Sequence, residues 1–270
     1  MNHDPKHASE FFDRYAELEW TRFDDERTPS TSLDVHLEYL RRYVSAGDRV
    51  LDVGAGPGRF TIELARLAAS IVVADISPGQ LDLNREKVAE AGLDGAVADR
   101  VLADVVDLPF EDASFDASVC YGGPISYVVD RAPDAVAELV RVTRPGGHVL
   151  VSVMSLVGAG QSYVDTVLDV ASRYGIELTE QIFTTGLLPE GPDLGHLPMK
   201  LFRWRELRDL LEPHGSIVAA SATGLLRPSK DPEDPALRAL LARIEIDLAS
   251  EPGALDCAPH MLAVLRRPER

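Results

Sequence analysis

Short apolar runs alternate with segments of helical periodicity through the middle of the chain. The apolar runs are rich in β-branched residues, end at glycines, acids or turn residues, and cover 49–53, 71–75, 100–104, 115–120 and 148–154. Runs of this length and composition are typical of strands buried on both faces of a parallel sheet. Two more strands are predicted at 216–222 and 261–265.

Helical segments lie between these strands. Residues 59–69 and 133–142 place apolar side chains on one face, and Ser77-Pro78-Gly79-Gln80 begins another helix with an N-cap serine and a capping-box glutamine. Strand–helix alternation with short connections implies right-handed crossovers. We therefore expect an α/β fold with a doubly wound, mostly parallel seven-stranded sheet. Further helices are predicted at 9–23, 32–44, 161–174 and 204–211.

The alternation also divides the chain into parts. The core, 47–154, is expected to follow an N-terminal helical cap, 1–46, and to precede an insertion, 155–200. Residues 201–270 are expected to complete the sheet. The insertion holds a predicted helix and a proline- and glycine-rich loop at 188–196. Long loops in compact domains commonly cover functional sites, so we interpret 155–200 as a lid that contacts the substrate.

Composition narrows the class of protein. Of the 270 residues, 45% are hydrophobic and 26% charged, which is the balance of an ordinary folded protein. The longest weakly polar run, 149–160, is shorter than the roughly 20 residues that span a bilayer, and no secretory signal is visible. The two cysteines are too few for a disulfide framework. We expect a cytoplasmic protein with no membrane partner.

The net charge bears on partners. It is −17, from 27 Lys and Arg against 44 Asp and Glu, so phosphate backbones are repelled and nucleic acid is not an expected partner. Only four residues are lysine: Lys6, Lys87, Lys200 and Lys230. Salt adaptation and the codon bias of a GC-rich genome both explain such an acidic, lysine-poor composition. The oligomeric state stays open.

The strongest local signal is a glycine loop. The strand at 49–53 runs directly into Gly54-Ala55-Gly56-Pro57-Gly58, and a helix begins at once. Glycines let the backbone turn sharply and let a ligand approach the main chain. The free amides of the helix start favour a polar or anionic group. The plainer interpretation is a tight strand-to-helix turn.

Two acids strengthen the ligand-binding interpretation. Asp75 ends the second strand, 21 positions after Gly54, and Asp104 ends the third. In a doubly wound sheet, Asp75 then reaches a ribose and accepts two hydroxyl hydrogen bonds. Asp104 is placed to accept from an adenine amine while the Val105 amide donates to a ring nitrogen. Each acid taken alone is also compatible with a solvated strand end.

These motifs together resemble the class I S-adenosylmethionine-dependent methyltransferases of small molecules, over about residues 45–155. The resemblance rests on the run 50–60, the acid within 73–77, Ala103-Asp104-Val105 and Arg144-Pro145-Gly146-Gly147. It implies S-adenosylmethionine as the cofactor and a Rossmann-like methyltransferase fold. It also implies cofactor-binding roles for Asp52 beneath the loop, Gly54, Ala55 and Gly56 at the methionine moiety, Asp75 at the ribose, Ile76, Asp104 and Val105 at the adenine, and Cys120 near the sulfonium.

Two other classes of protein are compatible with part of this pattern. A nicotinamide dehydrogenase shares the strand, glycines and acid, but Arg59 stands where its third glycine would fall, and no Tyr-x-x-x-Lys pair is present. A regulatory or scaffold protein that binds the cofactor without catalysis stays open, because no catalytic base is evident. No cluster with metal-ligand spacing is visible, so no metal is expected.

The acceptor is expected to be a small molecule, methylated on oxygen, nitrogen or carbon by in-line transfer. Residues 120–124 lack the Asn- or Asp-Pro-Pro-aromatic motif of enzymes that methylate base amines. Candidate catalytic residues are His196 in the loop, Tyr121 after the fourth strand, and Tyr15, whose phenol is expected to contact the cofactor. Each is also explained by ordinary packing or solvent exposure. His3 and His7 are expected in a floppy tail.

Overall fold

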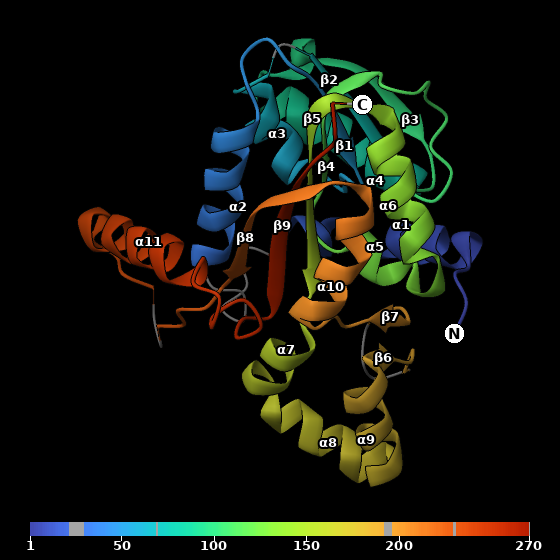
Figure 1. The fold of residues 1–270 in the computed structure, drawn as a ribbon, viewed down its shortest axis with the longest axis vertical. Coiled ribbons are helices and arrows are strands. Elements are labelled where there is room, and N and C mark those ends of the chain that lie inside the picture. The colour runs from blue at the N-terminus through green and yellow to red at the C-terminus, as the bar shows by residue number, and fades with distance from the viewer. Residues whose placement is uncertain (22–29, 69, 192–195, 229–230, 270) are drawn as a thin grey trace.

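The computed structural model describes the chain except residues 22–29, 69, 192–195, 229–230 and 270. Its centre is a seven-stranded sheet of order β3-β2-β1-β4-β5-β9-β8, in which β9 runs antiparallel to both neighbours (Figure 1). The predicted doubly wound, mostly parallel α/β sheet is therefore confirmed. Its strands are β1 (Arg49–Val53), β2 (Ser70–Asp75), β3 (Val97–Leu102), β4 (Phe115–Cys120), β5 (Thr143–Met154), β8 (Ser216–Thr223) and β9 (His260–Arg266).

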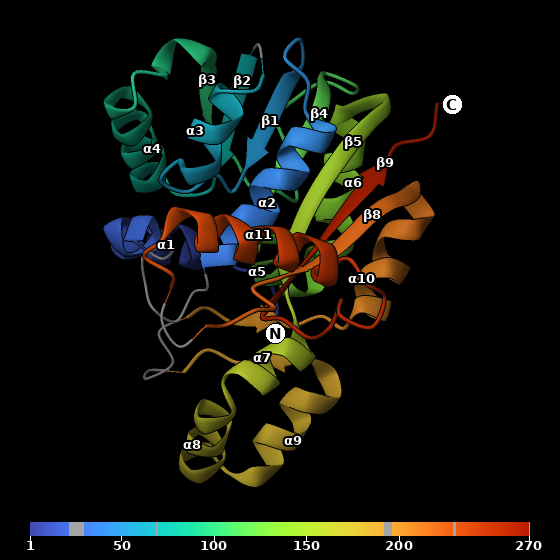
Figure 2. The same ribbon diagram turned by 90° about the vertical axis from the view of Figure 1, so that its left-hand side faces the viewer.

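Both faces of the sheet are covered, which explains the uninterrupted apolar strands. In β1, Val50 belongs to one hydrophobic cluster and Leu51 to the other, because successive side chains point to opposite faces. One face packs against α2 (Ser30–Tyr43), α3 (Arg59–Ala65), α4 (Pro78–Glu90) and α11 (Pro235–Ala249) (Figure 2). The other packs against α5 (Pro124–Tyr127), α6 (Ala132–Val142) and α10 (Trp204–Leu211).

The two N-terminal helices have different neighbours. Helix α2 buries Val35, Tyr39 and Leu40 in the sheet core and is therefore part of the covering layer. Helix α1 (Pro5–Thr21) instead packs against α4, and several of its side chains reach the carboxyl ends of the strands. The segment 1–46, expected to act as a cap, thus places only α1 over the strand ends.

A helical unit projects beyond the carboxyl end of β5 (Figures 1 and 2). The chain leaves and re-enters the sheet layer at adjacent points, because Leu156 N donates to the Phe202 carbonyl and Phe202 N donates to the Met154 carbonyl, both at 2.8 Å. The helix predicted over 161–174 corresponds to α8, which begins at Val164, and neither α7 nor α9 was predicted. The unit contains α7 (Leu156–Ser162), α8 (Val164–Tyr174), α9 (Ile176–Thr185), β6 (Leu187–Leu188) and β7 (Met199–Lys200).

The start of α4 shows how local sequence sets the frame of the site. Ser77 is the N-cap, and its Oγ accepts from the Gln80 amide at 3.0 Å, as predicted. The Gln80 side chain does not complete the capping box. Its Nε2 donates to the Phe12 carbonyl of α1 at 2.9 Å instead. The glutamine thus ties α1 to α4. In the parts of the chain that are described, no helix is long and apolar enough to cross a membrane.

Candidate cofactor and acceptor sites

The glycine loop after β1 is held in a conformation that few other residues adopt. Gly54, Gly56 and Gly58 have φ values of +63°, +52° and +96°. A Cβ at Gly54 would also lie 2.3 Å from Cγ of Pro124, the first residue of α5. Close approach and positive φ therefore both require glycine at position 54.

Asp52 supports this loop from below. The Thr61 hydroxyl of α3 donates to Asp52 Oδ2 at 2.6 Å, so the carboxyl group joins the strand to the helix that follows the loop. Complete burial, opposed by that hydrogen bond, raises the pKa of Asp52 to about 7. Asp52 is not among the residues that line the cavity described below.

Asp75 closes the loop from the side. Its Oδ2 accepts from the Gly56 amide at 2.8 Å and its Oδ1 from the Ser77 amide at 2.9 Å. Burial raises the pKa of Asp75 to about 6, against the lowering effect of these amides. A carboxylate with two oxygens retains acceptor capacity beyond one amide each, so Asp75 can take further donors.

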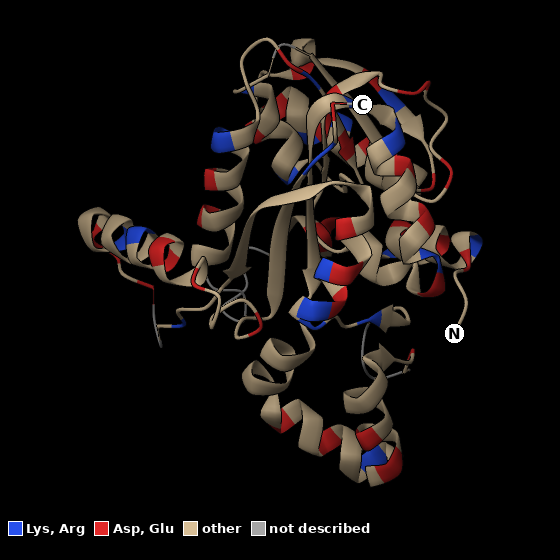
Figure 3. Ribbon diagram, in the orientation of Figure 1, with Lys and Arg blue, Asp and Glu red and all other residues tan. Residues whose placement is uncertain are grey.

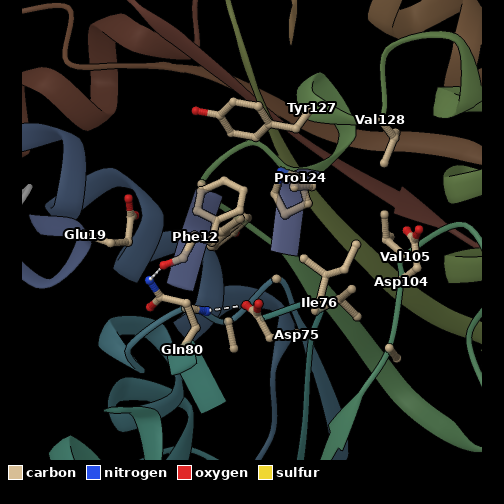
Figure 4. Close-up of a pocket in the computed structure, with 18 of the residues that line it drawn as sticks. Phe12, Glu19, Asp75, Ile76, Gln80, Asp104, Val105, Pro124, Tyr127 and Val128 are labelled. Atoms are coloured by element: carbon tan, nitrogen blue, oxygen red, sulfur yellow. Dashed lines mark hydrogen bonds between the residues drawn. The ribbon is translucent and has the colours of Figure 1, made fainter. Parts of the chain in front are cut away.

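A cavity opens at the carboxyl ends of β1, β2 and β4. We call it the cofactor cavity. Figure 4 shows Asp75 and Ile76 on one side, Asp104 and Val105 at one end, and Pro124 opposite. The residues expected at a cofactor that line it are Gly54, Ala55, Gly56, Asp75, Ile76, Asp104 and Val105, and the candidate catalytic residue Tyr121 lines it as well. The strand register thus brings together residues that are up to 67 positions apart in sequence (Gly54 to Tyr121).

The N-terminal segment occupies part of this cavity. His3 Nε2 lies 2.6 Å from Asp104 Oδ2, with only 6% of the His3 side chain exposed, and His3 N donates to Asp130 Oδ1 at 2.8 Å. His7 Nε2 lies 2.9 Å from Glu190 Oε2. The expectation of a floppy tail at His3 and His7 is therefore wrong, since both rings have partners far along the chain.

Helix α1 narrows the same space. Asp13 Oδ1 accepts from the Ser77 hydroxyl at 2.5 Å and from the Gly79 amide at 2.9 Å, which fixes α1 against the start of α4. Phe12 then projects into the cavity near Tyr127 (Figure 4). The remaining volume is about 100 Å³. Helix α1 and its side chains therefore take up part of the space at the strand ends.

Tyr121 Oη and Gln80 Oε1 are buried at the cavity and lack a hydrogen-bond partner within the described chain. Such atoms carry a desolvation cost unless a ligand satisfies them. S-adenosylmethionine offers an ammonium group, two ribose hydroxyls and an adenine amine as donors. The donor and acceptor chemistry of the cavity therefore fits this cofactor.

Tyr121 and Cys120 differ in their relation to the cavity. The Tyr121 ring lines it and packs edge-on against Phe60 and His36, and burial raises its pKa well above the usual value. Cys120 is wholly buried beneath the loop and does not line the cavity. Burial also raises the pKa of the Cys120 thiol, so the thiolate needed for nucleophilic chemistry is disfavoured.

A second, larger cavity lies between α1 and the helical unit. We call it the chamber; its volume is about 670 Å³. Tyr15 and His196 both line it, and neither lines the cofactor cavity. The Tyr15 phenol, expected to contact the cofactor, thus faces the chamber side of α1, with its ring stacked on Phe11 at 5.5 Å. The structure separates these two candidate catalytic residues from Tyr121.

His196 has a defined orientation. Its Nδ1 lies 2.8 Å from the Leu197 carbonyl, so Nδ1 carries the proton and Nε2 is left as an acceptor. Burial lowers the His196 pKa, against the raising effect of the Leu197 carbonyl and Glu190, so the ring is neutral near pH 7. The preceding part of the predicted loop, 192–195, lies outside the described residues.

The two cavities are neighbours. Tyr127 lines the cofactor cavity and packs against the cluster of Leu156, Met199 and Leu201, which line the chamber. Gly123 allows close packing here, because a Cβ there would lie 2.5 Å from Met154 Sδ. Helix α1 borders both sides, with Phe12 in one cavity and Tyr15, one turn later, in the other.

Sequence reasoning missed several residues at these cavities. His3, Phe12 and Tyr127 carry no local motif, and their places follow from contacts between distant segments. The sequence predicts Gln80 at the start of α4, but it does not predict the hydrogen bond of its side chain to α1. Among the described residues, no group of three or more His, Cys, Asp and Glu side chains is arranged to hold a metal ion.

Comparison with known proteins defines the class. Residues 50–147 match the family model described as "Methyltransferase domain". Together with the sheet order and the glycine loop, this match shows that the chain contains a class I S-adenosylmethionine-dependent methyltransferase domain. S-adenosylmethionine is the cofactor of that class.

Curated relatives align with only part of this chain. A demethylmenaquinone methyltransferase from Clavibacter sepedonicus is 41% identical over 106 residues, which cover 39% of this chain and 41% of the relative. The chain thus spans about two fifths of the length of the curated relatives it matches.

Solved structures share the fold over most of the chain. A methyltransferase from Methanosarcina mazei has a TM-score of 0.57 at 18% identity, covering 86% of this chain and 98% of that one. The N-methyltransferase NodS from Bradyrhizobium japonicum, solved with S-adenosylhomocysteine, has a TM-score of 0.55 at 15% identity, covering 92% of this chain and 91% of that one. At these identities the likeness shows the fold alone.

Proposed function

We propose that the protein transfers a methyl group from S-adenosylmethionine to an oxygen, nitrogen or carbon atom of a small-molecule acceptor. The observation that carries the proposal is that α1 borders two neighbouring cavities, one lined by the glycine loop and strand-end acids, the other large enough for a second molecule. In-line transfer requires the acceptor atom to contact the methyl carbon, so the side chains between the cavities would move aside when both reactants are bound.

On the cofactor side, residues of the glycine loop and the strand ends are proposed to bind and orient S-adenosylmethionine. The backbone of Gly54, Ala55 and Gly56 is proposed to border the methionine moiety, and Asp75 to accept from the ribose hydroxyls. Asp104 and Val105 are proposed at the adenine edge. The cofactor supplies a methyl group already activated on a positively charged sulfur. Asp52 would act indirectly, by holding the loop through Thr61.

On the acceptor side, His196 is the proposed proton acceptor. Its Nε2 has an available lone pair at the chamber, and its neutral ring needs no prior loss of a proton. As the acceptor atom forms its bond to the methyl carbon, the electron pair of the broken bond stays on sulfur. The proton that the acceptor loses would pass to Nε2. Tyr15 lies on the same side and would orient an acceptor.

Calorimetric titration with S-adenosylhomocysteine tests the cofactor assignment. Asp75→Ala should weaken binding by more than tenfold, about 1.4 kcal/mol, because two hydroxyl acceptors are lost. Asp82→Ala is the matched control, since that side chain is 78% exposed on α4 and should leave binding unchanged. Equal affinities of the wild type and Asp75→Ala would remove the ribose role.

Transfer itself needs a second measurement. Incubation with methyl-labelled S-adenosylmethionine and a metabolite extract should place label on a small product. Binding of S-adenosylhomocysteine with persistently no labelled product would favour the alternative of a cofactor-binding regulatory or scaffold protein.

A further inference from the structure

The chamber is notable for what lines it. Of its described lining residues, none is Asp, Glu, Lys or Arg, in a chain that is 26% charged residues. Its walls are mostly aliphatic and aromatic side chains from α1, the helical unit and the strand ends, including Leu18, Met154, Val167, Ile182 and Phe183. A charged ligand would lose its hydration there without gaining a counter-charge, which is costly.

The charged residues of α8 and α9 are exposed to solvent. They are Asp165, Asp169, Arg173, Glu177 and Glu180. Figure 3 marks the charged positions along these helices. Asp169 and Arg173 pair with each other at 2.9 Å, each about half exposed. The two helices therefore present apolar side chains to the chamber and keep their charged side chains in solvent.

Volume and polar positions further restrict the ligand. About 670 Å³ is within the range of roughly 300–1,000 Å³ that holds drug-sized ligands in preformed sites. The polar groups at the walls are hydroxyls, such as those of Tyr15, Tyr163 and Thr179, and the imidazoles of His196 and His260. Such groups hydrogen-bond hydroxyl or carbonyl oxygens without providing a fixed charge.

We propose that the chamber binds an uncharged, predominantly apolar organic molecule of drug size, carrying a hydroxyl or carbonyl group. This inference rests on the proposed function for its meaning, since such a molecule would be the methyl acceptor. Carboxylates, phosphates and free amines are excluded as the body of the ligand. The hydroxyl or carbonyl end meets the polar wall groups, and the apolar body meets α7, α8 and α9.

Two fluorescent probes test the charge selectivity. N-phenyl-1-naphthylamine is uncharged, and 8-anilino-1-naphthalenesulfonate has the same aromatic framework with one sulfonate added. The full chain should bind the uncharged probe at least tenfold more tightly. Similar affinities for the two probes would overturn the proposal.

Substitutions in α8 locate the bound probe. Val167 lines the chamber, whereas Val164, in the same helix, is 53% exposed and does not line it. Val167→Asp should weaken binding of the uncharged probe at least tenfold, and Val164→Asp should change it by less than twofold. Val167→Lys should weaken binding of the uncharged probe and strengthen binding of the sulfonate probe, because the lysine supplies the missing counter-charge.

The folding of each variant is checked by its thermal unfolding transition. If Val167→Asp does not fold, Thr166→Asp replaces it, since Thr166 is exposed yet lines the chamber. Equal effects at positions 164 and 167 would place the probe elsewhere and overturn the proposal. Neither probe reports on the cofactor. If S-adenosylhomocysteine binds but the expected probe results are not obtained, only the chamber inference is overturned. If the expected probe results are obtained but S-adenosylhomocysteine does not bind, only the proposed function is overturned.

Discussion

The cofactor cavity and the chamber share helix α1 as a wall but differ in almost every other respect. The first retains about 100 Å³ and is bordered by Asp75 and Asp104. The second has about 670 Å³ and, among its described lining residues, no Asp, Glu, Lys or Arg. The first is assembled from strand ends and the second largely from helices inserted after β5.

This difference reflects two modes of recognition. Strand ends in a parallel sheet have fixed positions, so backbone amides and carboxylates there can make directional hydrogen bonds to one particular ligand. The helical unit offers shape and apolar surface, which tolerate variation in the ligand. Under the proposed function, one end of the molecule would specify the methyl donor through hydrogen bonds, whereas the other would select an acceptor by size and absence of charge.

The largest expected effect comes from breaking the loop of the cofactor cavity. Gly54→Ala introduces a Cβ 2.3 Å from Pro124 Cγ at a φ of +63°. Strain at positive φ and overpacking together should lower the free energy of unfolding by about 2–5 kcal/mol. Denaturant unfolding measures this change.

A second glycine provides the control. Gly47→Ala meets no atom within 4 Å and should change the free energy of unfolding little. Probe binding in the chamber should survive Gly54→Ala in whatever fraction stays folded. Loss of both ligands in folded Gly54→Ala would show that the two cavities are not independent units.

The buried acid beneath the loop should make stability depend on pH. The pKa of Asp52 is raised to about 7 in the folded chain, so the folded state binds this proton more tightly than the unfolded state. The stabilisation is complete below about pH 4, the usual pKa of an aspartate, and is lost as pH rises through 7. The stability of the wild type relative to Asp52→Asn should therefore fall by at most about 4 kcal/mol from pH 4 to pH 8.

Urea unfolding of both proteins at each pH measures that difference. Asp82→Asn, on an exposed side chain, should show the same pH dependence as the wild type. A wild-type curve parallel to that of Asp52→Asn would mean that Asp52 is ionised in the folded chain throughout this range.

The smallest expected effect concerns the cover of the cofactor cavity. His3→Ala frees Asp104 Oδ2 from its contact at 2.6 Å. Because such a hydrogen bond contributes about 1 kcal/mol, S-adenosylhomocysteine should bind about fivefold more tightly in calorimetric titration. His7→Ala removes a similar contact, to Glu190, outside the cofactor cavity and should leave affinity unchanged. Weaker binding by His3→Ala would mean that His3 contributes to the site rather than competing for it.

The central strands of the sheet could be predicted from sequence because they are buried on both faces. Continuous apolar runs bounded by turns leave few alternatives, and β1, β4 and α10 were predicted at their observed limits. The glycine loop and strand-end acids were equally accessible, because parallel strands place successive carboxyl ends along one edge. Their proposed roles toward the cofactor stay predictions.

Helices α9 and α11 were not predicted, because their burial departs from the apolar stripe by which a helix is recognised in a sequence. In α11, Leu237, Leu240 and Ile244 are exposed while Glu245 is fully buried, where it accepts the amides of residues 224–226. In α9, Ile176 is 70% exposed. An apolar stripe is the usual sign of a packed helical face, so reversed burial conceals such helices. The chamber was likewise invisible, since it forms where α1 meets a unit some 140 residues further along the chain.

The shared wall formed by α1 has a thermodynamic consequence. Any shift of α1 that widens the donor side moves Phe12 and Tyr15 together, because they lie one turn apart on the same helix. Occupancy on one side must then alter affinity on the other by an equal factor in both directions. Movement of α1 alone would thereby couple the binding of the methyl donor to the binding of its acceptor.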